Sequence, residues 1–438
     1  MIQKKRLIYN TFLLTATSLL MSCIGIAFQV WLVGRISSAG IGLYQLVLSV
    51  TNLMLTFAIS GIRFASTRLV SEELGGQNCS GVGPAMRRCT AYGLFFGLAA
   101  GAILWFLAEP IGFLWIGDAR TVRSLRLSAF SMPCAALCAS MSGYFTACGR
   151  VWKPSLVHLI EQLIGIALVA LCLSCVPLSD IELSCAAVTV GRLSADIISL
   201  VLMLIVYLND RRRHYSDCCP GERLTARMLK IALPLAFSAY ARSALTTVQH
   251  LLVPRGLRAA GYSADGALSG YGTIQGMVLP IIFFPSCIMS AVAELIVPEL
   301  TEAQVQGDRR EIRTVTWRLF KTSAEFSALV GLFLFVFSDM LGLAVYKSGE
   351  AGHYIRLLAP LVPVMYTDMT IDGCLKGLGQ QVWSMGINIL DALTGLLLVW
   401  WLLPKYALAA YIGIIYFTEI LNFVLSLLRL RKVVSSTP

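Results

Sequence analysis

Apolar residues occur along the chain in long blocks separated by short polar segments, and this pattern predicts membrane-spanning helices. Runs of about 20 apolar residues match the thickness of a bilayer's hydrocarbon layer at a rise of about 1.5 Å per residue. A segment in that layer must satisfy its own backbone hydrogen bonds, so each block is expected to be a helix. We predict twelve spans, at residues 7–33, 41–62, 89–108, 125–147, 154–176, 184–208, 231–253, 268–291, 322–343, 354–375, 382–403 and 407–428.

Composition agrees with this pattern. Of the 438 residues, 57% are hydrophobic and only 13% are charged. A soluble domain has nearer 25% charged residues, so a soluble class is excluded. The first apolar block is too long for the hydrophobic region of a signal peptide, and we expect an uncleaved first span.

The distribution of positive charge predicts the orientation. With both termini on the inner side, 24 of the 35 Lys and Arg residues fall in inner segments and 9 in outer segments, while Arg192 and Arg242 lie within spans. The positive-inside rule then predicts that both termini are cytoplasmic. The net charge of +11 therefore reflects topology, and we expect no nucleic-acid partner.

An internal repeat divides the chain into two halves. At an offset of 230 residues, Pro133 aligns with Pro363, Gly143 with Gly373, and Glu161 with Asp391. Each copy has an even number of spans, so the two copies share one orientation, as in parallel-repeat transporters. We predict an N-terminal six-helix lobe at 1–208, a basic cytoplasmic linker at 209–230, and a C-terminal six-helix lobe at 231–438.

Polar residues inside the spans are the candidate site residues, because charge at membrane depth is costly. Arg242, Thr246, Gln249 and His250 follow i, i+4, i+7 and i+8, which is one face of a helix. This stripe predicts a surface that faces water or substrate. The alternative is that Arg242 pairs with a carboxylate on a neighbouring helix and only stabilises the bundle.

Acidic residues within spans are candidates for ion coupling or for structural contacts. Arg192 and Asp196 are spaced i, i+4 and can neutralise each other. Glu161 and Asp391 occupy equivalent repeat positions, where an acid can carry H⁺ or Na⁺ or can form a hydrogen bond between helices. Asp368 and Asp372 form a second i, i+4 pair that could hold a cation.

Catalytic apparatus is not apparent. The sequence has no Walker A motif, no nucleophile elbow and no metal-ligand cluster. We therefore expect neither an enzyme nor a cofactor, and no catalytic or metal-binding residue is assigned.

Two stretches resemble a known group of transporters. Residues 9–74, which begin YNTFLLTATSLL, resemble the first spans of the multidrug/oligosaccharidyl-lipid/polysaccharide flippase superfamily. Residues 242–257, with the pattern RxxLxxxxxLLxPRGL, resemble the stage V sporulation protein B-like polysaccharide transporters. The chain lacks the two extra spans of relatives that flip the peptidoglycan precursor lipid II.

The resemblance implies two six-helix lobes that form a V and open alternately to each side of the membrane. It implies a substrate such as a lipid-linked sugar or another amphipathic molecule, handled by a monomer among membrane lipids. Cavity arginines hold the pyrophosphate in lipid II flippases, and Arg242 is a candidate for that role, assisted by Arg63, Arg35 and Arg255. Arginine suits phosphate because its planar fork donates two hydrogen bonds.

Three functions stay open at this point. The first is a flippase for a lipid-linked oligosaccharide or a cell-wall precursor, with a role in sporulation as one setting. The second is a cation-coupled multidrug exporter of the same superfamily, which would need carboxylates such as Glu161, Asp368 and Asp391. The third is a membrane scaffold for envelope assembly that transports nothing.

Overall fold

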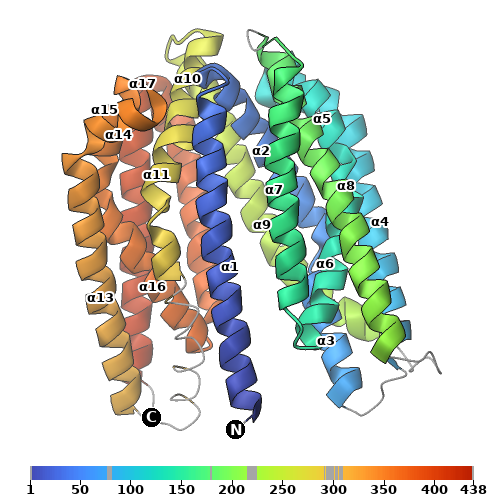
Figure 1. The fold of residues 1–438 in the computed structure, drawn as a ribbon. Coiled ribbons are helices and arrows are strands. Elements are labelled where there is room, and N and C mark those ends of the chain that lie inside the picture. Colours follow the sequence, from blue (N-terminus) through green and yellow to red (C-terminus); the bar gives the residue numbers. More distant parts are fainter. Residues whose placement is uncertain are drawn as a thin grey trace. The chain divides into compact units, whose positions relative to one another are not determined.

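The computed structural model describes residues 2–75, 81–177, 180–214, 224–290, 292, 300, 304 and 309–436. Every regular element in these residues is a helix, as the hydropathy pattern predicted (Figure 1). In the first half the helices are α1 (Ile2–Val33), α2 (Ser38–Ile59), α3 (Ile62–Gly75), α4 (Val82–Pro110), α5 (Val122–Ala129), α6 (Ser131–Ala147), α7 (Trp152–Ser174) and α8 (Ile181–His214). In the second half they are α9 (Leu224–Ala259), α10 (Ala264–Thr273), α11 (Leu279–Phe283), α13 (Arg309–Val336), α14 (Ser338–Tyr346), α15 (Gly349–Leu358), α16 (Val362–Gly377) and α17 (Gln381–Ser436).

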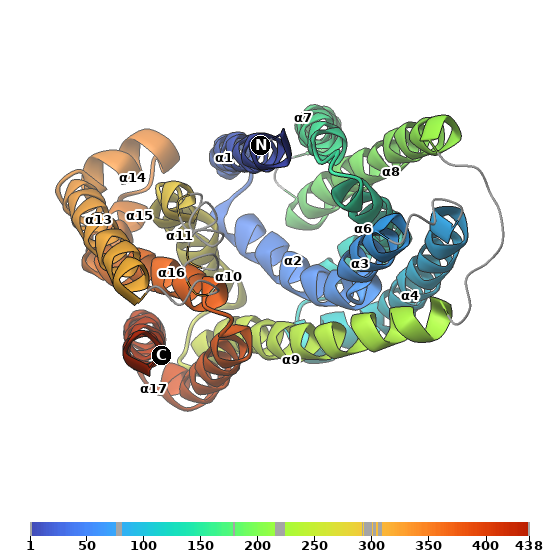
Figure 2. The ribbon, with the colours of Figure 1, turned by 90° about the horizontal axis from the view of Figure 1, so that it is seen from below.

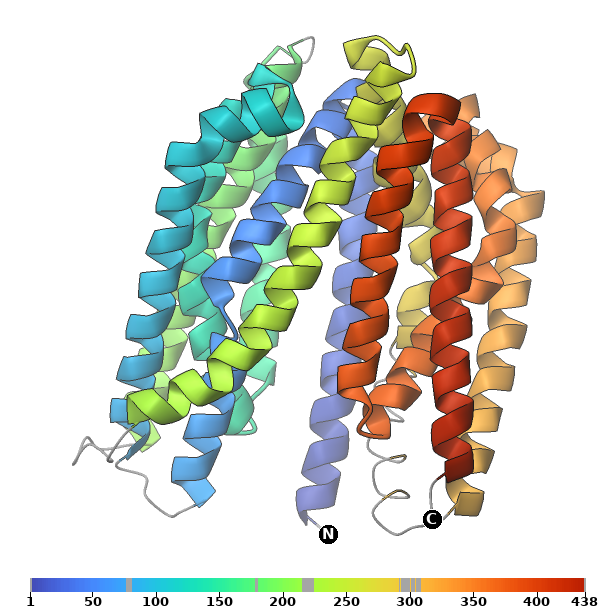
Figure 3. The same ribbon diagram turned by 180° about the vertical axis from the view of Figure 1, so that it is seen from behind.

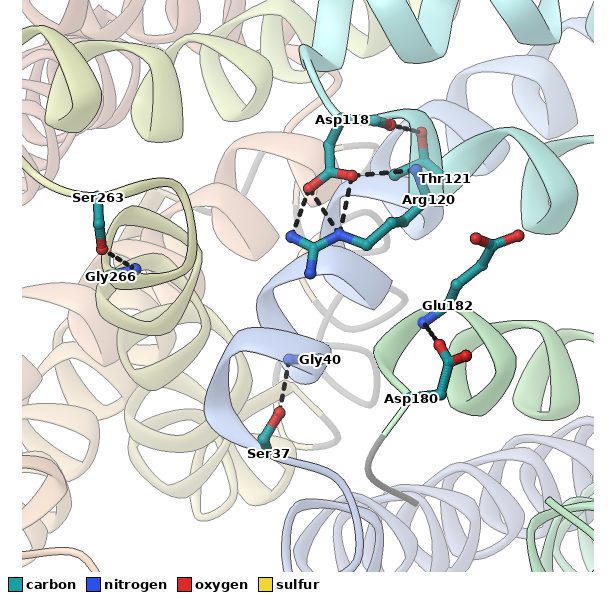
Figure 4. A network of polar contacts seen from close by, with 9 residues as sticks. All are labelled: Ser37, Gly40, Asp118, Arg120, Thr121, Asp180, Glu182, Ser263 and Gly266. Carbon is teal, nitrogen blue, oxygen red and sulfur yellow. Dashed lines mark hydrogen bonds and ion pairs between the residues drawn. The ribbon is translucent and has the colours of Figure 1, made fainter. Parts of the chain in front are cut away.

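Short turns of tighter or wider helix lie between several of these elements. They are the π-helices η2 (Ile111–Ile116) and η4 (Ile274–Val278), and the 3₁₀ turns η3 (Ala119–Thr121) and η5 (Ala359–Leu361). At η3, Asp118 caps the turn by accepting hydrogen bonds from the backbone N–H and the guanidinium of Arg120 (Figure 4).

Each predicted span falls on one or more of these helices. Over the described residues, seven helices are long and apolar enough to cross a membrane. Other predicted spans are divided into shorter pieces, such as α5 with α6, or α15 with η5 and α16. α17 contains two predicted spans. They are separated by a kink at Ala407, which has the non-helical angles φ 51° and ψ −137°. We call residues 381–406 its first arm and 408–436 its second arm.

The ninth predicted span needed correction. We expected it at 322–343, but α13 begins at Arg309 and ends at Val336. The helix breaks at Phe337, where φ is −97° and ψ is 12°, and α14 begins at Ser338. Helical structure therefore includes the cation-rich residues that were assigned to a loop, because hydropathy detects apolar residues and not the continuation of a helix beyond them.

Packing groups the chain into two compact units. Unit 1 contains Met1–Thr17 and Leu46–Thr247, and unit 2 contains Ser18–Gln45 and Val248–Pro438. This grouping follows contacts, whereas the predicted lobes follow the sequence repeat, so the boundaries 1–208, 209–230 and 231–438 stay a prediction.

Within unit 1, close helix packing depends on a glycine stripe. Gly93, Gly97 and Gly101 lie on the face of α4 that contacts α5 and α6. A Cβ on Gly97 would lie 2.7 Å from the Cα of Pro133, and one on Gly101 would lie 2.7 Å from the carbonyl oxygen of Ala129. Small residues here let the backbones approach, which is how helices associate where lipid supplies no hydrophobic driving force.

Within unit 2, α16 packs against α13 and against α17 (Figure 2). The two arms of α17 run side by side in opposite directions (Figure 3). Buried apolar side chains such as Ile371, Leu375 and Leu430 form a core between these helices. The polar residues carried by α16 and α17 are thereby held on a fixed frame.

Candidate functional site

A group of acidic side chains lies in unit 2, on α16 and on both arms of α17. Asp368 belongs to α16, Asp391 to the first arm and Glu419 to the second arm. Each is near enough to the other two for electrostatic repulsion. Asp368 is only 8% exposed and lies near Ser426, and its Oδ1 has no hydrogen-bond partner within the described part of the chain. We call Asp368, Asp391 and Glu419 the acidic cluster.

Among the described residues, Asp368 and Glu419 lack the ion pair that their neighbour Asp372 forms. Asp372, one turn beyond Asp368, is neutralised by Lys376, whose Nζ lies 2.5 Å from its Oδ2. In the described ranges, no basic side chain forms an ion pair with Asp368 or Glu419. Like charges in a low-dielectric interior repel strongly, so Asp368 and Glu419 need a proton or a nearby cation.

Metal ligation was also considered. Where the structure describes the chain, no three His, Cys, Asp or Glu side chains lie close enough to hold a metal ion. Hard cations bind through several converging oxygen ligands. The carboxylates of the acidic cluster do not form such a group of three.

A second polar group lies in unit 1, on α7 and α8. Glu161 accepts a hydrogen bond of 2.6 Å from the hydroxyl of Ser199, and its Oε2 lies 3.1 Å from Nδ1 of His158. Asp196 lies close to Glu161 and one turn from Arg192, with which it interacts electrostatically. Each acid of this group thus lies beside a nitrogen-bearing side chain, a histidine or an arginine. We call it the balanced cluster.

The repeat relates the two clusters. At the offset of 230, Glu161 corresponds to Asp391, and Asp196 corresponds to Ser426, which lies near Asp368. Cys138, which lies near Glu161 and Asp196, corresponds to Asp368 itself. Equivalent positions in the two halves therefore form polar groups in both units, but with different charge.

Arg242 lies on α9 and belongs to unit 1, where its side chain is exposed. Its carbonyl oxygen accepts a hydrogen bond of 3.0 Å from the hydroxyl of Thr246, as the i, i+4 spacing implies. Within the described residues, no carboxylate forms an ion pair with the Arg242 guanidinium. The alternative, in which Arg242 forms a structural ion pair, therefore finds no carboxylate for Arg242 among these residues.

Gln249 and His250 lie farther along α9, in unit 2. The Nδ1 of His250 is 3.2 Å from the hydroxyl of Tyr271, with which it shares a hydrogen bond. Gln249 lies against α17, since a Cβ on Gly395 would come within 2.8 Å of its Nε2. Both side chains thus make packing contacts inside unit 2, while Arg242 and Thr246 belong to unit 1.

The other candidate arginines are distributed over both units. Arg63 is exposed in the first turn of α3, and Arg35 lies with its guanidinium 5.7 Å from the centre of the Trp31 ring. Arg255 is half-buried on α9. Arg63 and Arg242 belong to unit 1, and Arg35 and Arg255 to unit 2. Neither unit alone contains all four.

Sequence reasoning missed Glu419 and Asp210. Glu419 is a lone acid in the last predicted span, so the cost of charge at membrane depth was a signal that could have found it. Asp210, near the end of α8, accepts hydrogen bonds from Tyr144, Arg150 and Lys153. We call these four residues the α8 clamp. Its partners are 57 to 66 residues distant in sequence, and no spacing rule relates them.

Comparison with known proteins places this architecture in a family. The MatE family model matches residues 14–171 and 257–401, which is more than half of the chain. The chain belongs to the MatE family. This family falls within the multidrug/oligosaccharidyl-lipid/polysaccharide flippase superfamily, so the resemblance seen in the sequence is confirmed. The chain is a multi-pass membrane protein of a transporter family.

Two characterised relatives come from Bacillus subtilis (strain 168). Stage V sporulation protein B is 23% identical over 408 residues, which cover 90% of this chain and 78% of the relative. Sporulation protein YkvU is 20% identical over 395 residues, covering 86% of each chain.

Solved structures share the fold of this MatE-family chain. An inward-facing multidrug resistance MATE transporter has a TM-score of 0.71 at 14% identity, covering 95% of this chain and 96% of its own. A superfamily transporter from Pyrococcus furiosus, described as having a binding pocket of reversed polarity, has a TM-score of 0.66 at 12% identity, covering 98% and 96%. At these identities the likeness establishes an all-helical MATE-like membrane fold.

Proposed function

We propose that this MatE-family transporter is a flippase for a lipid-linked oligosaccharide or a cell-wall precursor in the bacterial cytoplasmic membrane. It would work by alternating access, with both termini cytoplasmic. The observation that carries the proposal is Arg242, an exposed arginine at mid-span that has no carboxylate partner among the described residues. Such a charge is too costly to leave against hydrocarbon, so it requires water or an anion.

The chemistry of arginine supports an anionic substrate group. A guanidinium donates two parallel hydrogen bonds to phosphate and keeps its charge at any physiological pH. A pyrophosphate that links a lipid to sugars presents such oxygens. The similarity to stage V sporulation protein B over 90% of the chain supports the same class of substrate and a role in spore formation.

The acidic cluster supports coupling of transport to a cation. Asp368, Asp391 and Glu419 repel one another without a basic partner at Asp368 or Glu419 in the described residues. Binding and release of a proton would change their mutual repulsion, and with it the relative stability of two conformations. The cation is H⁺ or Na⁺, since either would offset the repulsion.

A cation-coupled multidrug exporter is the second candidate, and the same acidic cluster favours it. An exported organic cation would be attracted to carboxylates and repelled by Arg242. The two candidates therefore predict opposite effects when Arg242 is neutralised.

Proteoliposome transport of both substrate classes tests the proposal. One assay follows a fluorescent polyprenyl-diphosphate sugar from one leaflet to the other, and the second follows efflux of ethidium. We expect Arg242→Ala to abolish lipid flipping and Arg242→Lys to retain part of it, because lysine keeps the charge but lacks the fork. Arg318→Ala is the matched control, since Arg318 is also exposed and has no carboxylate partner among the described residues.

The outcomes separate the candidates. Full flipping by correctly inserted Arg242→Ala would overturn the assignment of Arg242 to the substrate. Ethidium efflux that is unchanged or increased in Arg242→Ala, with no flipping by the wild type, would favour the exporter. Absence of both activities in the wild type would favour a scaffold.

A further inference from the structure

A groove lies between the two arms of α17, within unit 2. Its volume is about 520 Å³. Leu398, Leu402 and Tyr406 line it from the first arm, and Ala410, Gly413 and Phe417 line it from the second. We call this hollow the α17 groove.

The sequence of the second arm explains why the groove is open. Between the larger side chains of Ile414 and Phe417 and the end where the arms meet, Ala409, Ala410 and Gly413 border the groove with little side-chain volume. A Cβ added to Gly413 would meet no atom within 4 Å. No side chain of the described residues fills the space that these small residues leave.

The surroundings decide what can fill it. Both arms are apolar enough to belong to the membrane-spanning part of the chain, so hydrocarbon is the local medium. Water would find almost no polar partner on this lining and is excluded. An empty groove would forfeit dispersion contacts along its length. A flexible hydrocarbon chain recovers them, and Tyr406 and Phe417, 64% and 53% exposed, leave the groove accessible.

A cation lies next to the groove at the end where the two arms meet. Lys405 is the neighbour of Tyr406, about 100° around the helix from the lining face. Its Nζ lies 4.9 Å from the centre of the Trp401 ring, one turn earlier. Trp and Lys are typical of the interface where lipid headgroups lie. An ammonium group there attracts the phosphate of a lipid headgroup.

We propose that the α17 groove binds one acyl chain of an anionic phospholipid, whose phosphate pairs with Lys405. The groove fits the acyl chain, and Lys405 selects an anionic headgroup. The site concerns a bilayer lipid and stands whether or not the transported substrate is lipid-linked.

Native mass spectrometry of the purified protein tests the site. The protein is equilibrated with mixed micelles that contain dioleoyl phosphatidylglycerol and dioleoyl phosphatidylcholine in equal amounts. The wild type should retain one phosphatidylglycerol that Gly413→Leu loses, because leucine occupies the groove. Ala410→Phe is a second filling variant, in case the first folds poorly. Gly386→Leu is the matched control, because Gly386 is exposed on the first arm with no atom within 4 Å of its Cβ position.

The charge is tested separately. Lys405→Gln should weaken retention of phosphatidylglycerol about fivefold and leave phosphatidylcholine unchanged. Lys432→Gln, which removes a cation near the C-terminus, should change neither. Equal retention of phosphatidylglycerol by the wild type and a stably folded filling variant would overturn the proposal. Equal retention of the two lipids by the wild type would also overturn it. So would a wild-type dimer that Gly413→Leu dissociates, because a second copy of the chain would then occupy the groove.

Discussion

The α8 clamp allows a sharp prediction, because its geometry is fully described. The carboxylate of Asp210 is completely buried and lies 2.7 Å from Nη1 of Arg150. The hydroxyl of Tyr144 donates to it at 2.9 Å, and Lys153 forms a further ion pair. The clamp thus joins α6, the start of α7 and the end of α8. Asp210→Asn keeps the size of the side chain and removes only its charge.

The expected loss of stability follows from the burial. Breaking a buried ion pair by removing one partner costs about 3–5 kcal/mol. Arg150 and Lys153 are 22% and 20% exposed, so both can turn partly toward water after the substitution. We therefore expect a loss of about 2–3 kcal/mol, which corresponds to a fall of roughly 4–12 °C in Tm for a unit of this size.

Thermal unfolding in detergent, followed by circular dichroism, measures the effect. Glu325→Gln is the control, because it removes an exposed ion pair with Lys321 whose partners are 68% and 65% exposed. That change should cost no more than about 0.5 kcal/mol. Lys153→Met should cost less in the Asp210→Asn background than in the wild type, since the pair is already broken. A Tm of Asp210→Asn equal to that of the control would refute the reasoning.

Three further predictions concern packing, coupling and topology. Gly42→Ala should lower the free energy of unfolding by about 1–3 kcal/mol or more, because its Cβ would lie 2.0 Å from the carbonyl oxygen of Leu268. Gly386→Ala should be neutral, and thermal unfolding of both variants in detergent compares them. Asp391→Asn should uncouple transport from an imposed proton gradient more than Glu161→Gln does, and the reverse order would contradict the assignment to the acidic cluster. A cysteine that replaces Arg310, in a background without native thiols, should react with a membrane-impermeant reagent only after the cells are permeabilised.

Much of the fold followed from sequence because hydropathy over a span is a local property. The breaks did not follow, because they depend on backbone geometry at single residues. Phe337 ends α13 without any proline or glycine to signal it. At Ala407, Pro404 three residues earlier was the available signal, and it correctly lay between two predicted spans.

The site was predictable to a lesser degree. The repeat identified Glu161 and Asp391 as equivalent positions, and the structure describes a polar group around each. The sequence repeat could not reveal that Ser199, 38 residues away, donates a hydrogen bond to Glu161. Contacts between helices produce no periodic pattern in the sequence. Charge balance depends on these partners, so the difference between the two clusters became visible only in the folded chain.

That difference extends to a second pair of equivalent positions. Arg150 and Lys153, which hold Asp210 in unit 1, correspond at the offset of 230 to Gln380 and Trp383 in unit 2. There Gln380 accepts hydrogen bonds from Arg429, whose guanidinium lies 4.1 Å from the centre of the Trp383 ring.

Equivalent residues of the two halves thus hold the last helix of each half. In unit 1 they bind the buried acid Asp210 of α8, and in unit 2 they bind Arg429 of the second arm of α17. Unit 1 has basic or imidazole side chains beside its acids at both places, the α8 clamp and the balanced cluster. Unit 2 satisfies its arginine with neutral partners and leaves the acidic cluster without a basic partner at Asp368 and Glu419 in the described residues. A paired charge stabilises a single arrangement, whereas mutually repelling acids change their energy whenever a proton binds or leaves. If transport is coupled to a cation as proposed, we therefore expect the coupling residues to lie in unit 2, at the acidic cluster.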